Sequence, residues 1–186
     1  MTIQLLQKIF SWVKLYCMEG LEQKVWWNYI ESDLQKLFIT SRFLINTLES
    51  WGSEDTERDR QFEDYSFVVF PAAKAYEGFL KKMFLDLGFI TEDDYYGKHF
   101  RIGKSLNPSL PKEIRKDEVY GKIVVYCGGK ELADNLWETW RVSRNLVFHW
   151  FPNQKNAITF GGAIERVEMI IKALDQSFEG CKLDIK

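Results

Sequence analysis

The apolar residues of this chain recur at steps of three and four positions, a spacing that places them on one face of a helix. Two segments near the amino terminus have this pattern, residues 2–18 and residues 21–50. In the longer segment the apolar positions are Val25, Ile30, Leu34, Leu37, Ile39, Phe43, Leu44 and Leu48. We therefore predict a pair of helices at the amino-terminal end.

A charged run interrupts the pattern at residues 52–64 (GSEDTERDRQFED), where apolar side chains are scarce. Such runs are typical of solvated loops and of boundaries between structural units. We expect a boundary here, with an amino-terminal helical extension over residues 1–60 and a second, larger domain over residues 61–186.

The helical pattern returns in residues 65–88, close to a heptad rhythm, and Gly88 is a suitable stop. Its apolar positions include Phe70, Ala73, Tyr76, Leu80, Met83 and Leu87. Pro71 predicts either the vicinity of the helix start or a kink. Glu77 falls among the apolar positions, and a carboxylate there needs a partner if it is buried.

Residues 91–126 give a weaker signal. Thr91 with Asp94 three residues later resembles a capping box that begins a short helix. Residues 97–111 combine basic residues with Pro and Gly and predict a basic, irregular loop. Residues 112–126 fit a short helix, although Lys122–Cys127 (KIVVYC) also fits a strand.

The last two predicted elements are clear helices. Residues 130–151 have helical periodicity, and Pro152 ends the pattern. Thr159 is a suitable N-cap for a final helix over residues 160–178. Only 12 Gly and 4 Pro occur in 186 residues, which is few for the frequent turns of an all-β fold. The sequence therefore predicts an all-α helical bundle.

Charge and cysteine content limit how the protein can bind nucleic acid and in which compartment it works. The net charge of −2 gives no overall positive field, so any contact with nucleic acid must be local. Cys17, Cys127 and Cys181 are widely spaced and form no CxxC pair, which predicts free thiols in a reducing compartment. The amphipathic start is unlike a signal peptide, and no run of 18 apolar residues suggests a membrane span. We expect a cytoplasmic protein without a membrane partner.

The candidate chemistry lies in the segment Arg144–His149 (RNLVFH). On an ideal helix Arg144 and His149 are about 140° apart around the axis and about 7.5 Å apart along it. Asn145, four residues before the histidine, shares its face. Since one helix cannot focus this arginine and this histidine on one phosphate, we predict a homodimer whose two-fold axis gathers both motifs.

These residue types suit RNA cleavage without a metal. Histidine titrates near neutrality and can take a proton from the 2′-OH or give one to the leaving oxygen. A guanidinium can meet the charge that builds on the phosphorane oxygens. The carboxylates near this helix lie at ordinary surface spacing, so we expect neither a metal site nor a cofactor.

A family resemblance adds to this reasoning. The segment RNLVFH matches the R-N-x-x-x-H form of the Rx4–6H motif of the HEPN superfamily (higher eukaryotes and prokaryotes nucleotide-binding). Residues 71–88 (PAAKAYEGFLKKMFLDLG) resemble the helix that precedes the catalytic helix in the HEPN domain of RNase LS-type toxins. The resemblance covers about residues 65–178 and implies a HEPN-like helical bundle. It also implies a dimeric ribonuclease of a toxin–antitoxin or antiviral system, with an antitoxin partner.

The resemblance also suggests roles for particular residues. Glu77 matches a functional glutamate of the family, and Lys74 matches the basic residue three positions earlier. We expect Glu77 to lie within hydrogen-bonding reach of Arg144 or His149. The predicted catalytic residues are therefore Arg144, His149, Glu77 and Asn145, and the predicted substrate-binding residues are Lys74 and Arg141.

Other readings stay open at this point. Arg144 and His149 could be a surface arginine and a core histidine, and Glu77 could form a structural ion pair. Trp150 and Phe151 could stack on a base, although packing in the core or a dimer interface fits them better. The chain could also be a HEPN module without catalysis that binds RNA, a nucleotide or a protein, or a plain helical scaffold.

Overall fold

The computed structural model describes residues 18, 20–51 and 62–180, and every regular element within these ranges is helical. The predicted all-α fold is thereby confirmed. The helix expected over residues 2–18 and most of the charged run at 52–64 lie outside the described residues. Within the described part, no helix combines the length and apolar character that a membrane span needs.

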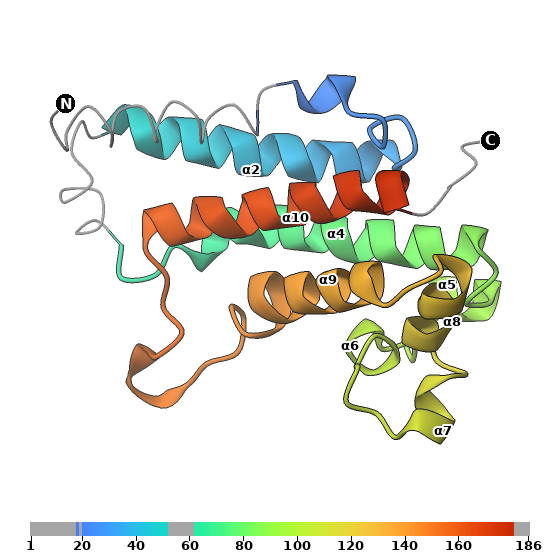
Figure 1. The fold of residues 1–186 in the computed structure, drawn as a ribbon. Helices are drawn as coiled ribbons and strands as arrows, with labels where there is room; N and C mark the ends of the chain where they lie inside the picture. Colours follow the sequence, from blue (N-terminus) through green and yellow to red (C-terminus); the bar gives the residue numbers. More distant parts are fainter. Residues whose placement is uncertain (1–17, 19, 52–61, 181–186) are drawn as a thin grey trace, which may run out of the picture.

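Three long helices lie side by side and form the body of the fold (Figure 1). They are α2 (Ser32–Trp51), α4 (Ser66–Asp86) and α10 (Phe160–Gly180), and α9 (Glu131–Trp140) packs against α10. One cluster of buried side chains joins them, and its largest fully buried members are Trp26, Tyr65, Tyr76, Phe38, Phe79 and Phe84. The predicted extension up to residue 60 thus contributes α2 to the same core as the remaining helices.

The first described segment corrects the prediction of one helix from residue 21 to 50. A short 3-10 turn, η1 (Leu21–Gln23), comes first, and α2 begins only at Ser32. The intervening chain turns the indole of Trp26 into the core, where Nε1 donates to Asp175 Oδ1 at 2.8 Å. The turn buries the large Trp26 ring in the core, and this burial favours the turn over a helix continuous with α2.

The buried face of α2 also differs from the expected one. Leu34 and Leu48 are buried as predicted, whereas Ile39 and Phe43 are exposed, as is Val25 in the turn before the helix. The buried residues of the helix are Leu34, Phe38, Ser41, Ile45 and Leu48. The apolar pattern of residues 21–50 mixed two faces of the chain, and periodicity alone did not separate them.

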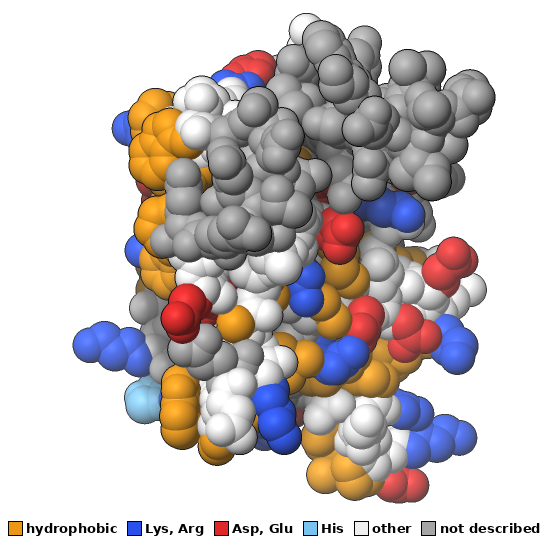
Figure 2. Space-filling view, turned by 90° about the vertical axis from the view of Figure 1, so that its left-hand side faces the viewer, with side chains coloured by type: hydrophobic (Ala, Val, Ile, Leu, Met, Phe, Trp, Pro, Cys, Tyr) orange, Lys and Arg blue, Asp and Glu red, His pale blue; other side chains and the backbone are white. Residues whose placement is uncertain are grey.

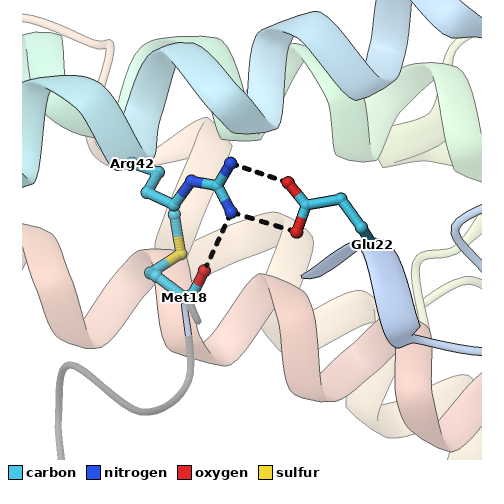
Figure 3. A network of polar contacts seen from close by, with 3 residues as sticks. All are labelled: Met18, Glu22 and Arg42. Atoms are coloured by element: carbon cyan, nitrogen blue, oxygen red, sulfur yellow. Dashed lines mark hydrogen bonds and ion pairs between the residues drawn. The ribbon is translucent and has the colours of Figure 1, made fainter. Parts of the chain in front are cut away.

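An arginine fixes the η1 turn to α2 (Figure 3). The Arg42 guanidinium donates to both carboxylate oxygens of Glu22, at 2.7 and 3.2 Å, and to the Met18 carbonyl at 3.4 Å. The hydrogen bond from Arg42 lowers the pKa of the Glu22 carboxyl below its ordinary value. This network ties the start of the described chain to the middle of α2.

Ser41 of α2 explains how α4 tolerates Pro71 in its second turn. The fully buried Ser41 hydroxyl donates to the Val68 carbonyl at 2.9 Å and accepts from the Ala72 amide at 3.0 Å. These two backbone groups would pair with each other in a regular helix. The hydroxyl therefore satisfies the backbone beside the proline, where the helix is one N–H donor short.

The expected stop of α4 and the capping box after it are both present. Gly88 follows the helix with a φ of 68°, a left-handed conformation that glycine adopts without strain. The Thr91 hydroxyl accepts from the Asp94 amide at 3.2 Å, and the Asp94 carboxylate accepts from the Thr91 amide at 3.1 Å. This box begins α5 (Glu92–Tyr96) as predicted.

The middle of the chain is more helical than expected. The loop predicted over residues 97–111 contains α6 (Ile102–Ser105), because Ile102 and Leu106 bury their side chains in the core. α7 (Lys112–Arg115) and α8 (Val119–Tyr126) follow, which decides between the helix and the strand in favour of a helix.

One prediction about the cysteines is wrong. Cys127, at the end of α8, is disulfide-bonded and not a free thiol. The other two cysteines lie outside the described residues. The cysteine argument for a reducing compartment therefore no longer supports a cytoplasmic location.

The last helix begins and packs as predicted. The Thr159 hydroxyl accepts from the Gly162 amide at 3.1 Å, which satisfies one free donor at the start of α10. The expected core positions Ile164, Val167, Ile171 and Leu174 are all buried.

Candidate active site

The helix that carries the arginine–histidine motif changes its hydrogen bonding at Arg141. α9 ends at Trp140, and η2 (Arg141–Asn145) is a π-helical turn in which the Leu146 amide donates to the Arg141 carbonyl at 2.9 Å. Residues 146–149 form a turn and a bend. The prediction of a helix through residue 151 is therefore wrong beyond Asn145.

Asn156 supplies the physical reason for this early end. Its side-chain amide donates to the Leu146 carbonyl at 3.1 Å and also to the His149 carbonyl. These carbonyls would otherwise lack partners where the helix stops. Val147 is buried at the same point, which anchors the turn to the core. A cap from a residue in the following loop leaves no trace in the local periodicity.

Arg144 forms an ion pair with Glu77 of α4. Nη2 of the arginine lies 3.4 Å from Oε2 of the glutamate, so the expected contact is present. The two side chains are 37% and 39% exposed, respectively, so this pair is at the edge of the core and open to water. The guanidinium carbon also lies 5.0 Å from the centre of the Trp140 ring, a cation–π contact that fixes its other side.

A pocket opens where α4 faces η2 and the following turn. Its volume is about 230 Å³, and its lining residues are Phe70, Ala73, Lys74, Glu77, Arg144 and Phe148. Phe70 and Phe148 meet edge to face with ring centres 5.5 Å apart and form the apolar side. Lys74 is exposed, so the pocket presents two cations and one carboxylate to a ligand.

His149 and Asn145 form the second part of the candidate site. The histidine Nε2 lies 3.1 Å from the Asn145 amide oxygen, which is the predicted pairing. His149 is exposed and does not line the pocket that holds Arg144. A single chain therefore places Arg144, Glu77 and Lys74 together and leaves His149 and Asn145 outside the pocket.

Arg141, the other predicted substrate-binding residue, is engaged within its own helix. Its Nε and Nη2 donate to the two carboxylate oxygens of Glu138 at 2.8 and 2.6 Å. This paired geometry raises the pKa of Arg141 and lowers that of Glu138. Arg141 is not among the residues that line the pocket.

The sequence reasoning missed three residues of the site. Trp140 holds the other side of the Arg144 guanidinium, and its position four residues earlier could have suggested this contact. Phe70 was expected in the core but is 54% exposed at the pocket. Asn156 had no local signal at all.

Apolar side chains are exposed around the motif. Trp150 is 80% exposed and Phe151 is 39% exposed, so neither packs in the core of this chain. Figure 2 shows the end of the molecule where the chain returns to α10, with hydrophobic side chains in a band along one edge. Within the described residues, no group of three His, Cys, Asp or Glu side chains could hold a metal ion.

The glutamate of the ion pair lies in a segment that matches a family model. Residues 56–103 match the model of the RnaseLS-like HEPN family. The predicted resemblance is thereby confirmed. This HEPN match includes Lys74 and Glu77, and it ends before Arg144 and His149, so it is independent of the arginine–histidine motif. No curated protein matches the chain, and neither does any solved structure.

Proposed function

We propose that this chain is a metal-independent endoribonuclease of the HEPN type that works as a homodimer. The observation that carries the proposal is the Glu77–Arg144 ion pair on the wall of a pocket. It joins the HEPN-matched helix to the arginine–histidine motif, two features that were recognised separately. Both side chains of the pair are more than a third exposed, so it contributes little to stability, which favours a role in the site.

The chemistry assigns a role to each group. Arg144 stabilises the negative charge that develops on the phosphorane oxygens. His149 acts as general acid and base, and the Asn145 amide orients its ring. Glu77 holds the guanidinium in place, and Lys74 adds a second positive charge at the pocket. Attack by the 2′-OH leaves a 2′,3′-cyclic phosphate on one product.

The homodimer completes the site. Within one chain His149 lies outside the pocket that contains Arg144. A two-fold axis near the motif would bring both copies of Arg144 and His149 to one cleft. The exposed rings of Trp150 and Phe151 supply apolar surface for such an interface.

The biological setting follows from the family resemblance alone. RNase LS-type HEPN toxins belong to toxin–antitoxin systems, so we propose a toxin or antiviral effector that acts in the cytoplasm and is neutralised by an antitoxin. Arg141 would bind substrate only if RNA displaced its pairing with Glu138, which makes it the weakest of the proposed contacts.

The test is RNA cleavage in EDTA by the full chain, with variants purified in parallel. We expect cleavage to 2′,3′-cyclic phosphate ends, and a loss of about 100-fold or more in His149→Ala and Arg144→Ala. Lys172→Ala, an exposed change on α10, serves as the control with unchanged activity. Full activity in His149→Ala would overturn the proposal. Activity that disappears with chelation and returns with Mg²⁺ would overturn the metal-independent mechanism.

A further inference from the structure

One segment of this acidic chain has a clear excess of positive charge. Residues 97–116, called the basic segment here, contain six Lys and Arg residues and a single carboxylate, whereas the whole chain has a net charge of −2. The segment spans α6 and α7, which lie together on the side of α9 away from α2 (Figure 1). The net charge of the whole chain therefore conceals a locally positive surface.

Four of these cations have no role in holding the fold together. Lys98, Arg101, Lys112 and Lys116 are exposed, and none has an ion-pair partner among the described residues. The other two are engaged: Lys104 lies 3.8 Å from Glu118, and the Arg115 guanidinium lies 5.6 Å from the Tyr120 ring centre. The four exposed cations are therefore available to an anionic ligand.

An exposed aromatic ring stands beside these charges. Tyr96, two residues before Lys98, is 80% exposed and is held edge-on by Tyr95, with ring centres 4.9 Å apart. Cations that follow a backbone, combined with an aromatic face for stacking, are what single-stranded nucleic acid requires. An acidic protein surface would use the cations but would leave the tyrosine without a role.

The basic segment is in direct contact with the candidate active site. At Gly103 of α6, a Cβ atom would lie only 3.0 Å from Nε1 of Trp140. The same indole carries the Arg144 guanidinium on its ring. One tryptophan thus separates the basic segment from the proposed catalytic arginine.

We propose that the basic segment, together with Tyr96, binds the sugar–phosphate backbone of single-stranded RNA next to the bond that is cleaved. This inference rests on the proposed ribonuclease function and identifies the surface that the RNA contacts outside the pocket. Phosphate contacts of Lys98 and Arg101 hold the strand over α6, and a base stacks on Tyr96. The strand then runs from α6 to the pocket at Arg144, with the buried Trp140 beneath it joining the two surfaces.

The experiment measures RNA binding apart from cleavage. The full chain with His149→Ala is titrated with a labelled single-stranded RNA at several salt concentrations, and anisotropy gives the affinity. The test variant adds Lys98→Gln and Arg101→Gln. A matched control adds Lys36→Gln and Lys172→Gln instead, two exposed lysines on α2 and α10 whose loss changes the net charge equally.

We expect the test variant to bind about tenfold more weakly near 0.1 M salt, with a salt slope reduced by about 1.4, since each contact to a single strand contributes about 0.7. The control should match the parent. Tyr96→Ala should weaken binding by about fivefold or more and leave the salt slope unchanged.

Equal losses in the test and control variants would overturn the inference, because general charge would then explain the binding. Poly-glutamate binding as tight as RNA, with no effect of Tyr96→Ala, would also overturn it and indicate a protein surface. The outcome is separate from the proposed function. If the wild-type chain cleaves RNA and the test variant binds normally, only the inference fails; if binding changes as expected without cleavage, only the proposed catalysis fails.

Discussion

The substitution Glu77→Gln tests the link between the HEPN-matched helix and the motif. It keeps the size and shape of the side chain and removes only the negative charge opposite Arg144. A structural ion pair and an orienting role in catalysis predict opposite results. The variant therefore separates the two readings of this glutamate.

The geometry sets the expected cost in stability. At the 3.4 Å separation of Nη2 and Oε2, two unit charges attract by about 1 kcal/mol in bulk water and about 5 kcal/mol at an effective dielectric constant of 20. Both side chains are more than a third exposed, so the net contribution to stability is at most about 1 kcal/mol. The melting temperature should fall by no more than about 2–4 °C.

The expected cost in activity is larger. In the proposed mechanism, bound RNA excludes water from the pocket, so the charge of Glu77 would act more strongly on the Arg144 guanidinium during the reaction than in the free protein. Loss of this orientation should slow cleavage by about 10–1000-fold, which corresponds to about 1.4–4 kcal/mol in the barrier.

The assay combines a single-turnover cleavage rate with a melting curve for each variant. The control is Glu22→Gln, which breaks another half-exposed arginine–carboxylate pair, that of Glu22 with Arg42, away from the pocket. It should lose a similar small amount of stability and keep its full rate. A Glu77→Gln protein with reduced stability and full activity would refute the orienting role.

Further tests follow from other contacts. We expect sedimentation to show a dimer at micromolar concentration and Trp150→Glu to yield an inactive monomer, because this exposed ring is assigned to the interface; an active monomer would contradict the shared site. Gly78→Ala should destabilise the fold by about 1–3 kcal/mol, since a Cβ there would lie 2.6 Å from Leu34 Cδ2, and an unchanged melting temperature would show that the leucine moves aside freely. The carboxyl pKa of Glu22, followed by NMR, should lie below its ordinary value and rise in Arg42→Gln. Because the folded state depresses this pKa, the stability it contributes is present above the unfolded pKa and is lost as the pH falls through the folded one.

Local sequence signals located the helices that begin and end by local chemistry. The Thr91–Asp94 box, the Gly88 stop and the Thr159 cap all formed as predicted, because each involves residues only a few positions apart. The spacing placed Asn145 and His149 on one face of a helix; their side chains do meet, but His149 lies in the bend after the helix ends. The resemblance carried by residues 71–88 identified Glu77, a charge that periodicity alone would have assigned to the edge of the core.

Contacts between segments far apart in the sequence decided the features that the local patterns did not predict. Asn156 ends the motif helix early, Ser41 repairs the backbone beside Pro71, and Asp175 holds Trp26 in a turn where the pattern favoured a helix. Each of these partners is remote in sequence, or lies in a loop without periodicity, so no local pattern contains it. The amino acid sequence by itself determined an all-helical chain and the residues capable of the chemistry. Only the tertiary structure decided that Arg144 meets Glu77 at a pocket while His149 remains outside it, because side-chain positions at the end of a helix depend on what packs against that end.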